Sequence, residues 1–404
     1  MEVVVSKQKT EGRTVAPPSK SQAHRYAVAT LLSMPNGEGL AFVDTLASFN
    51  DDVFSTVEGL KKILDKRIDC PTVNVAQSAS TLRFLLPIAC ALKRSVKFVG
   101  EGRVMQRPIY PLVNALNENG ADIKVCDDCI CVEKGNLKNG KFNLTGSVSS
   151  QFVSGLMFAL PLLENDSEII IDGALSSKGY VDMTIDALVD FDVKVLPCEN
   201  GYFIKGGQCY CQPKHVSIEG DWSSAAVLLS MGALCGSVCV DEINAQSRQP
   251  DVAILDVLYK MGANVVFGEN SVCVSKNRLV PTDVCVDGCP DIAPIVAVLL
   301  ANANGVSKIS GASRLRYKES DRFLGIVQML ASFGVKCEIE GDALLIHGGK
   351  VCAGEFSTDD HRMAMSATVL GLCADGESKI RGAECISKSY PHFLRDIERY
   401  VEVK

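Results

Sequence analysis

The sequence predicts an α/β protein of two domains, each built from three β-α-β-α-β-β units whose inner helices are buried. Three observations support this fold class. The chain has 404 residues, 47% hydrophobic and 22% charged, which is enough for two domains with sizeable cores. A helix–turn–strand pattern recurs at a nearly constant spacing. A second set of helices is apolar nearly all round, as is typical of helices inside a protein.

The recurring pattern is a helix that ends in a tight turn and leads into a strand rich in β-branched residues. Its turn residues are Gly120, Asp192, Gly262 and Gly334, spaced 72, 70 and 72 residues apart. Glycine suits such a turn because the residue that ends the helix adopts a left-handed conformation. A polar loop between two alternating segments follows each turn and predicts a β-hairpin. The spacing indicates six units of about 65–70 residues.

The apolar helices alternate with the first set and open with residues that commonly cap or start helices. Their sequences are SKSQAHRYAVATLL, SASTLRFLLPIACAL, SSQFVSGLMFALPLL, DWSSAAVLLSMGALCG, PDIAPIVAVLLANANG and DHRMAMSATVLGLCADG. The first turn of a buried helix presents unpaired N–H groups and the positive end of the helix dipole. Several such turns directed at one cleft would bind an anion, even in a chain of net charge −7.

The composition argues against several classes of protein. A net charge of −7 disfavours nucleic-acid binding. No apolar segment is long enough to span a membrane and the first residues do not resemble a signal peptide, so we expect a cytoplasmic protein. We therefore expect its seventeen cysteines to remain thiols. Cys126, Cys129 and Cys131 form a CxxCxC motif, but the equivalent strands carry Val, Ile and Leu, so we expect buried hydrophobic side chains rather than a zinc site.

Polar residues at the helix starts form a set suited to a ligand with several phosphate or carboxylate groups. Most of them lie in the motifs PSKSQAHR, GSVSSQF, SRLRYKESDR, DHRMAM and SKSYPHF. In this order the motifs resemble the signatures of the 3-phosphoshikimate 1-carboxyvinyltransferase (EPSP synthase) family, across nearly the whole chain. The resemblance implies the two-domain enolpyruvyl-transferase fold, in which each domain is an inside-out α/β barrel.

The resemblance also implies a division of the chain and a reaction. We expect one domain of residues 1–12 plus 220–404 on the phosphoenolpyruvate side, a second of residues 13–219 on the shikimate 3-phosphate side, and an active site in the cleft between them. The implied reaction joins the enolpyruvyl group of phosphoenolpyruvate to the 5-hydroxyl of shikimate 3-phosphate and releases phosphate. This step of aromatic amino acid biosynthesis is the target of glyphosate. We expect a monomer that uses no metal or cofactor and binds no nucleic acid or membrane.

Family position also implies roles for individual residues. Asp291 is expected to accept the proton of the 5-hydroxyl, Glu319 to be its acid–base partner at the methylene carbon, and Lys20 to lie close to both. The residues expected to bind shikimate 3-phosphate are Lys20, Ser21, Arg25, Ser149, Ser150, Gln151, Ser177, Tyr180, Asp291 and Lys318. Those expected around phosphoenolpyruvate are Lys20, Ala79, Arg107, Gln151, Arg322, Arg362 and Lys388.

Simpler structural roles also fit several of these residues. Ser149, Ser150 and Asp291 stand where helix caps are common. Glu319 is placed to pair with Arg322, three residues further along a helical turn. These alternatives stay open on the sequence alone.

One stretch departs from the family pattern. Members commonly carry Asn-x-Gly near the start of the second buried helix, where this chain has Gln77 and Ala79. The glycine position lies where the backbone approaches phosphoenolpyruvate, so the methyl group of Ala79 should narrow that pocket. We expect weakened binding of the bulkier inhibitor glyphosate relative to phosphoenolpyruvate.

Two rival functions are disfavoured by particular residues. The related UDP-N-acetylglucosamine enolpyruvyl transferases carry a reactive cysteine five residues before the arginine that Arg107 matches, and Gly102 occupies that position here. A binding protein on the same scaffold would be expected to lose Asp291, Glu319 or Lys20, and all three are present.

Overall fold

The computed structural model describes residues 1–34, 40–147 and 149–404. The chain divides into two compact units, which we call unit one (Met1–Ser19 with Glu219–Lys404) and unit two (Lys20–Ile218). Within the described ranges, none of the helices combines the length and hydrophobicity that crossing a membrane requires.

The N-terminal segment belongs to unit one because both of its strands are built into sheets there. β1 (Glu2–Ser6) lies between β19 (Glu377–Arg381) and β20 (Glu402–Val403). β2 (Thr10–Val15) pairs in parallel with β11 (Gly236–Asp241). The boundary expected after residue 12 therefore falls later, after Ser19, since the pairing of β2 holds residues 13–15 in unit one.

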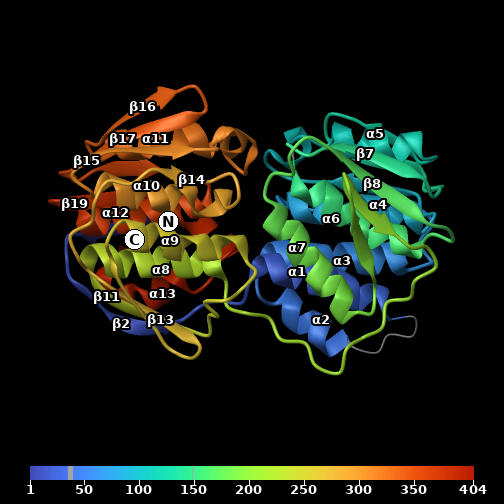
Figure 1. The fold of residues 1–404 in the computed structure, drawn as a ribbon, viewed down its shortest axis with the longest axis horizontal. Coiled ribbons are helices and arrows are strands. Elements are labelled where there is room, and N and C mark those ends of the chain that lie inside the picture. Colours follow the sequence, from blue (N-terminus) through green and yellow to red (C-terminus); the bar gives the residue numbers. More distant parts are fainter. Residues whose placement is uncertain (35–39, 148) are drawn as a thin grey trace. The chain divides into compact units, whose positions relative to one another are not determined.

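Unit one has three four-stranded sheets, in the strand orders β18-β19-β1-β20, β12-β13-β11-β2 and β14-β15-β17-β16 (Figure 1). Its remaining strands are β12 (Asn264–Phe267), β13 (Ser271–Ser275), β14 (Val284–Cys285), β15 (Gly305–Ser310), β16 (Lys336–Glu340), β17 (Ala343–Gly348) and β18 (Glu355–Ser357). Its α-helices are α8 (Trp222–Cys235), α9 (Ile254–Lys260), α10 (Ala293–Ala301), α11 (Arg322–Ser332), α12 (His361–Cys373) and α13 (Phe393–Asp396).

The inner helices of unit one are α8, α10 and α12. Every residue of α8 and α10 is buried, and in α12 only the last residue, Cys373, is partly exposed. The sheets are covered on one face only: in β13, Val272 and Val274 are buried while the alternate residues, Ser271, Cys273 and Ser275, are partly exposed. Helices inside and half-exposed sheets outside form the inside-out arrangement that was expected.

Over its described residues, 20–34, 40–147 and 149–218, unit two has two four-stranded sheets, in the orders β3-β4-β6-β5 and β7-β8-β10-β9. Its strands are β3 (Thr72–Asn74), β4 (Val96–Val99), β5 (Asp122–Val125), β6 (Cys129–Lys134), β7 (Lys141–Thr145), β8 (Ser167–Asp172), β9 (Val195–Cys198) and β10 (Gly201–Ile204). Its α-helices are α1 (Lys20–Leu32), α2 (Leu40–Ala47), α3 (Asp51–Leu64), α4 (Ala79–Ala91), α5 (Tyr110–Glu118), α6 (Ser150–Ala159) and α7 (Lys178–Asp190). Short 3-10 helices in the two units are Val104–Gln106, Leu160–Leu162, Pro250–Ala253, Pro290–Ile292, Ser313–Tyr317, Ala383–Lys388 and Glu398–Tyr400.

All five sheets share one pairing pattern, a parallel edge pair followed by two antiparallel pairings. The predicted repeat is therefore confirmed in five copies. Its turn residues Gly120, Asp192, Gly262 and Gly334 all have positive φ, between 59° and 96°. The sixth predicted copy differs: among its described residues, α2 lies between α1 and α3 and no strand is present. The buried Val43 and Leu46 are three positions apart with the exposed Asp44 and Thr45 between them, which is a helical spacing.

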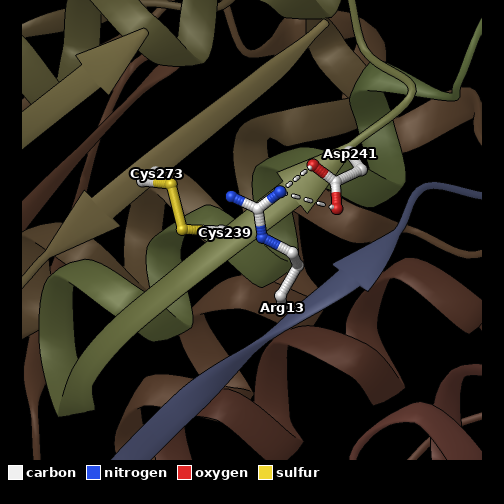
Figure 2. The surroundings of a disulfide bond; sticks show 4 residues. All are labelled: Arg13, Cys239, Asp241 and Cys273. Atoms are coloured by element: carbon white, nitrogen blue, oxygen red, sulfur yellow. Dashed lines mark hydrogen bonds and ion pairs between the residues drawn. A yellow bond between two sulfur atoms is a disulfide. The ribbon is translucent and has the colours of Figure 1, made fainter. Parts of the chain in front are cut away.

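Two expectations about the cysteines are wrong. Strand register places Cys239 of β11 opposite Cys273 of β13, and the two form a disulfide beside the Arg13–Asp241 ion pair (Figure 2). The second expectation was burial of the CxxCxC motif. Cys126 lies between β5 and β6 and is exposed. Cys129 and Cys131 are partly exposed because the alternate residues of β6, Ile130 and Val132, face the core.

Candidate active site

Each inner helix of unit one begins beside an aspartate. Asp221 caps α8 by accepting a hydrogen bond from the backbone N–H of Ser224 at 2.9 Å. Asp360 caps α12 in the same way, accepting from the N–H of Arg362 at 2.9 Å. The N-cap of the 3-10 turn before α10 is Cys289, and Asp291 lies within that turn. Its carboxylate is bound by cations from another segment.

Arg322 is the centre of this cluster. Its side chain is 1% exposed, and its three nitrogens bind three different carboxylates, each at 2.8 Å: Nε to Asp360, Nη1 to Asp291 and Nη2 to Glu319. Lys318 adds a second cation, with its Nζ 2.9 Å from the same Oδ1 of Asp291. The sequence RYKESDR thus supplies Lys318, Glu319 and Arg322 from one short stretch, and the fold brings Asp291 and Asp360 to it.

The charges around Asp291 decide its protonation state. Burial alone would raise the pKa of this carboxyl, but Lys318, Arg322 and Arg362 outweigh burial and hold the pKa well below its usual range. Burial lowers the pKa of Lys318 more than Asp291 raises it. Asp291 is therefore ionised at neutral pH and accepts hydrogen bonds.

Arg362 has unused hydrogen-bonding capacity. It lies in the first turn of α12 with its side chain 4% exposed, and its Nη2 is 3.6 Å from Asp221 Oδ2. Its Nε and Nη1 are buried without a hydrogen-bond partner among the described residues. Leaving buried donors of a guanidinium unpaired is costly, and the planar N–H pair matches a carboxylate or phosphate. Lys388, whose Nζ lies 3.4 Å from the carbonyl oxygen of Asp359, is a further cation near the start of this helix.

Asp251 is a member of the cluster that the sequence prediction missed. It lies in the 3-10 turn that precedes α9, is 3% exposed and accepts a hydrogen bond from Ser223 Oγ of α8. Burial and the nearby charge of Asp291 raise its pKa to about 6. A sequence pattern could have identified Asp251, because Pro250–Asp251 repeats the Pro-Asp pair that places Asp291 before α10.

In unit two, α1 begins with Lys20, whose Nζ is 3.0 Å from Asp52 Oδ2 in the first turn of α3. Both side chains are largely buried, with 16% and 14% of their surface exposed. Asp52 was not predicted as a site residue. The sequence pattern around Asn50 is typical of a helix cap followed by an acidic first turn. It does not indicate that Asp52 contacts Lys20.

Arg25 is bound within the protein. Its Nε donates to Thr184 Oγ1 at 2.8 Å, and its two terminal nitrogens donate to the carbonyl oxygens of Ser21 at 2.6 Å and Tyr180 at 2.7 Å. Burial lowers its pKa to about 10. These bonds tie α1 to the first turns of α7, so in this structure Arg25 holds together elements that carry predicted ligand-binding residues.

The start of α6 forms a second polar group in unit two. Ser149 caps the helix, accepting from the N–H of Gln151 at 3.3 Å, while Ser150 is buried in its first turn. The Gln151 side chain donates to Ser80 Oγ at 2.7 Å and accepts from Arg83 Nη1 at 2.8 Å. Arg83 and Ser80 lie on α4, and their bonds to Gln151 join α4 to α6. Arg83 belongs to the polar helix-start set but was assigned to neither substrate, and Ser80 was not predicted.

Three further predicted residues lie at the ends of elements. Ser177 precedes α7 with a left-handed φ of 53° and is 2% exposed. Such a conformation is strained for a residue with a Cβ and often marks functional sites. Ala79 is the first residue of α4 and is 4% exposed. Arg107 ends the 3-10 helix Val104–Gln106 and is partly exposed.

Comparisons with known proteins show which family the chain resembles along nearly its whole length. A sequence model of the family EPSP synthase (3-phosphoshikimate 1-carboxyvinyltransferase) matches residues 4–397. The chain is 34% identical over 420 residues to a 3-phosphoshikimate 1-carboxyvinyltransferase of Methanocorpusculum labreanum, covering 99% of this chain and 98% of that protein. It is 38% identical over 419 residues to the protein of the same name from Clostridium acetobutylicum, with 96% and 95% coverage.

Solved structures show the same fold at lower sequence identity. An EPSP synthase of Acinetobacter baumannii superposes with a TM-score of 0.76 at 21% identity, covering 100% of this chain and 99% of that one. The enolpyruvyl transferase NikO of Streptomyces tendae superposes with a TM-score of 0.75 at 13% identity, with 100% and 98% coverage. The predicted fold class is confirmed.

Proposed function

The chain belongs to the EPSP synthase family, and on this premise we propose that it transfers the enolpyruvyl group of phosphoenolpyruvate to the 5-hydroxyl of shikimate 3-phosphate. The products are 5-enolpyruvylshikimate 3-phosphate and phosphate. The observation that carries the proposal is the cluster of Lys318, Glu319 and Arg322 around the ionised Asp291. It combines a proton acceptor, a second carboxyl group and two cations, joined by ion pairs of Lys318 and Arg322 to Asp291 and of Arg322 to Glu319, as this chemistry requires.

We propose that phosphoenolpyruvate binds to residues of unit one and is also contacted by cations of unit two. Arg362 supports this assignment because its buried Nε and Nη1 lack partners among the described residues, and a carboxylate or phosphate oxygen would satisfy them. Arg322 and Lys388 complete the cationic group on unit one. Lys20, Arg107, Gln151 and Ala79 are the proposed contributors from unit two.

Asp291 is proposed as the group that receives the proton of the 5-hydroxyl. Its pKa is held well below the usual range by Lys318, Arg322 and Arg362, which makes it a weak base before substrates arrive. Two anionic substrates would neutralise part of that positive charge and raise the pKa of Asp291, so base strength would develop only in the loaded site. Glu319, bound to Arg322 Nη2, is the proposed acid–base partner at the methylene carbon.

Shikimate 3-phosphate is assigned mainly to unit two. Ser149, Ser150 and Ser177 stand at the first turns of α6 and α7, where N–H groups and the helix dipole favour a phosphate. Ser21, Arg25, Gln151 and Tyr180 are proposed to contact the remainder of this substrate together with Lys20, Lys318 and Asp291. Because each unit carries only part of the set, we propose an active site in the cleft between the domains, in a monomeric cytoplasmic enzyme.

The decisive assay mixes the protein with shikimate 3-phosphate and phosphoenolpyruvate and follows inorganic phosphate. We expect release only when both compounds are present, and loss of release in Asp291→Ala. The matched control is Asp342→Asn, which changes an exposed carboxylate of the same unit and should leave the rate unchanged. Release from phosphoenolpyruvate alone would indicate a hydrolase and would contradict the proposal.

A further inference from the structure

Unit one contains a pocket at the C-terminal ends of its inner helices, away from the helix starts that carry Asp221 and Asp360. The pocket has a volume of ≈ 740 Å³. Its wall includes Leu234 and Cys235 at the end of α8, and Leu372 and Cys373 at the end of α12. It shares no residue with the candidate active site, so it needs an explanation of its own.

Two thiols lie side by side in this wall. Cys235 Sγ and Cys373 Sγ are 3.4 Å apart, although the residues are separated by 138 positions in the chain. A disulfide bond is about 2.05 Å long, so an approach of about 1.4 Å would bring the sulfurs to bonding distance. Cys235 and Cys373 are the last residues of α8 and α12, respectively.

The pocket is positively charged and favours a thiolate. Lys7, Lys9, Lys276 and Lys350 line it, against two carboxylates. The hydrogen bond between the thiols lowers the pKa of Cys235, with Lys276 and Lys7 acting in the same direction against burial. The same bond, together with burial, raises the pKa of Cys373 well above its usual range. Cys373 Sγ also donates to the carbonyl oxygen of Val369 at 3.3 Å. With these directions, that bond assigns the attacking role to Cys235 and the resolving role to Cys373.

We propose that this pocket is a thiol-oxidation site at which a small anionic disulfide converts Cys235 and Cys373 into a disulfide. The Cys235 thiolate attacks one sulfur of the reagent, forming a mixed disulfide and releasing one thiolate. That thiolate takes the proton of Cys373, whose sulfur then attacks Cys235 Sγ and displaces the second thiolate. The reagent gains two electrons and leaves as two thiols, while the two cysteines lose two electrons and form one bond. The lysines favour an anionic reagent over a neutral one.

The test uses the full-length protein and oxidised glutathione as the anionic disulfide, with peptide mapping by mass spectrometry. We expect a Cys235–Cys373 cross-link that lacks two hydrogens and retains no glutathione. Cys373→Ser should retain glutathione on Cys235, because the resolving thiol is gone. Cys235→Ser should leave Cys373 unmodified over the same time. The exposed Cys70 serves as an internal reference for reagent activity.

The reagent class is tested by repeating the reaction with bis(2-hydroxyethyl) disulfide, which is uncharged. We expect the cross-link to form about 10-fold more slowly than with oxidised glutathione, relative to the modification of Cys70. Lys276→Met should remove part of this difference. Equal rates of Cys235–Cys373 cross-linking with the two reagents would overturn the proposal that the site prefers an anionic disulfide. Modification of Cys70 without any Cys235–Cys373 cross-link in the wild-type protein would overturn the site itself, whether or not the serine variants fold.

Discussion

Replacing Arg322 with methionine would remove a buried cation that three carboxylates share. Of these, Asp360 is 0% exposed, whereas Asp291 and Glu319 keep 24% and 21% of their side-chain surface exposed. Water can therefore solvate two of the three charges, and Asp360 becomes the uncompensated buried one. Breaking one buried ion pair costs about 3–5 kcal/mol, so we expect the unfolding free energy of unit one to fall by that amount at neutral pH.

The measurement can be confined to unit one because Trp222 is the single tryptophan of the chain and is fully buried at the start of α8. Its fluorescence during urea unfolding reports on this unit. The pH dependence gives a second test. In the wild type, the pKa of Asp360 and of Asp291 is lowered, so their contribution to stability persists down to acid pH. In Arg322→Met, Asp360 stays buried without its cation, and burial raises its pKa above the unfolded value. The variant therefore regains stability as the pH falls and Asp360 takes up a proton.

We therefore expect the stability gap between wild type and Arg322→Met to shrink as the pH is lowered from neutral toward the unfolded carboxyl pKa near 4. The matched control is Arg395→Met, which removes an arginine that is 65% exposed and lies 3.4 Å from Asp396, and should cost less than about 1 kcal/mol. A loss below about 1 kcal/mol in Arg322→Met, or a gap that does not change with pH, would refute the argument that Arg322 compensates buried carboxylates.

Four further predictions concern single side chains. Arg107→Ala should raise the apparent KM for phosphoenolpyruvate by a factor equivalent to several kcal/mol, because a desolvated anion loses its partner. An unchanged KM would show that Arg107 does not bind this substrate. Ala79→Gly should increase inhibition by glyphosate relative to the wild type, since a methyl group is removed from the proposed phosphoenolpyruvate pocket; equal inhibition constants would contradict this. Gly155→Ala should lower the unfolding free energy of unit two by about 1–3 kcal/mol, because the added Cβ would lie 2.1 Å from the carbonyl oxygen of Arg83. Urea unfolding followed by circular dichroism measures this. An unchanged unfolding free energy would mean that α4 and α6 can separate freely. For Asp251, whose pKa is raised to about 6 in the folded protein, the stabilising contribution is complete below the unfolded pKa near 4 and is lost as the pH rises through 6. The stability of the wild type relative to Asp251→Asn should therefore fall by about 2–3 kcal/mol between pH 4 and pH 7, as followed by Trp222 fluorescence, and a constant difference would exclude this titration.

The sequence alone determined the features that depend on near neighbours in the chain. The left-handed turns at Gly120 and Asp192, the hairpins after them and the fully apolar inner helices follow from local conformational preference and periodicity, and they were predicted correctly. The stretch with Lys318, Glu319 and Arg322 was also readable, because its members are at most four residues apart. The family motifs extended this reading to Asp291 and Arg362, whose roles in binding and catalysis stay predictions.

Only the tertiary structure decided which distant side chains meet. Asp52 lies beside Lys20, Asp251 beside Ser223, and Cys235 beside Cys373, although 28 to 138 positions separate the members of these pairs. Strand register joined Cys239 to Cys273, and α2 lies between α1 and α3 where strands were expected. The physical reason is that a local pattern specifies the conformation and the buried face of a segment, whereas the packing of whole elements sets the distance between two faces. That packing depends on all side chains of the core at once and is not encoded at any single position.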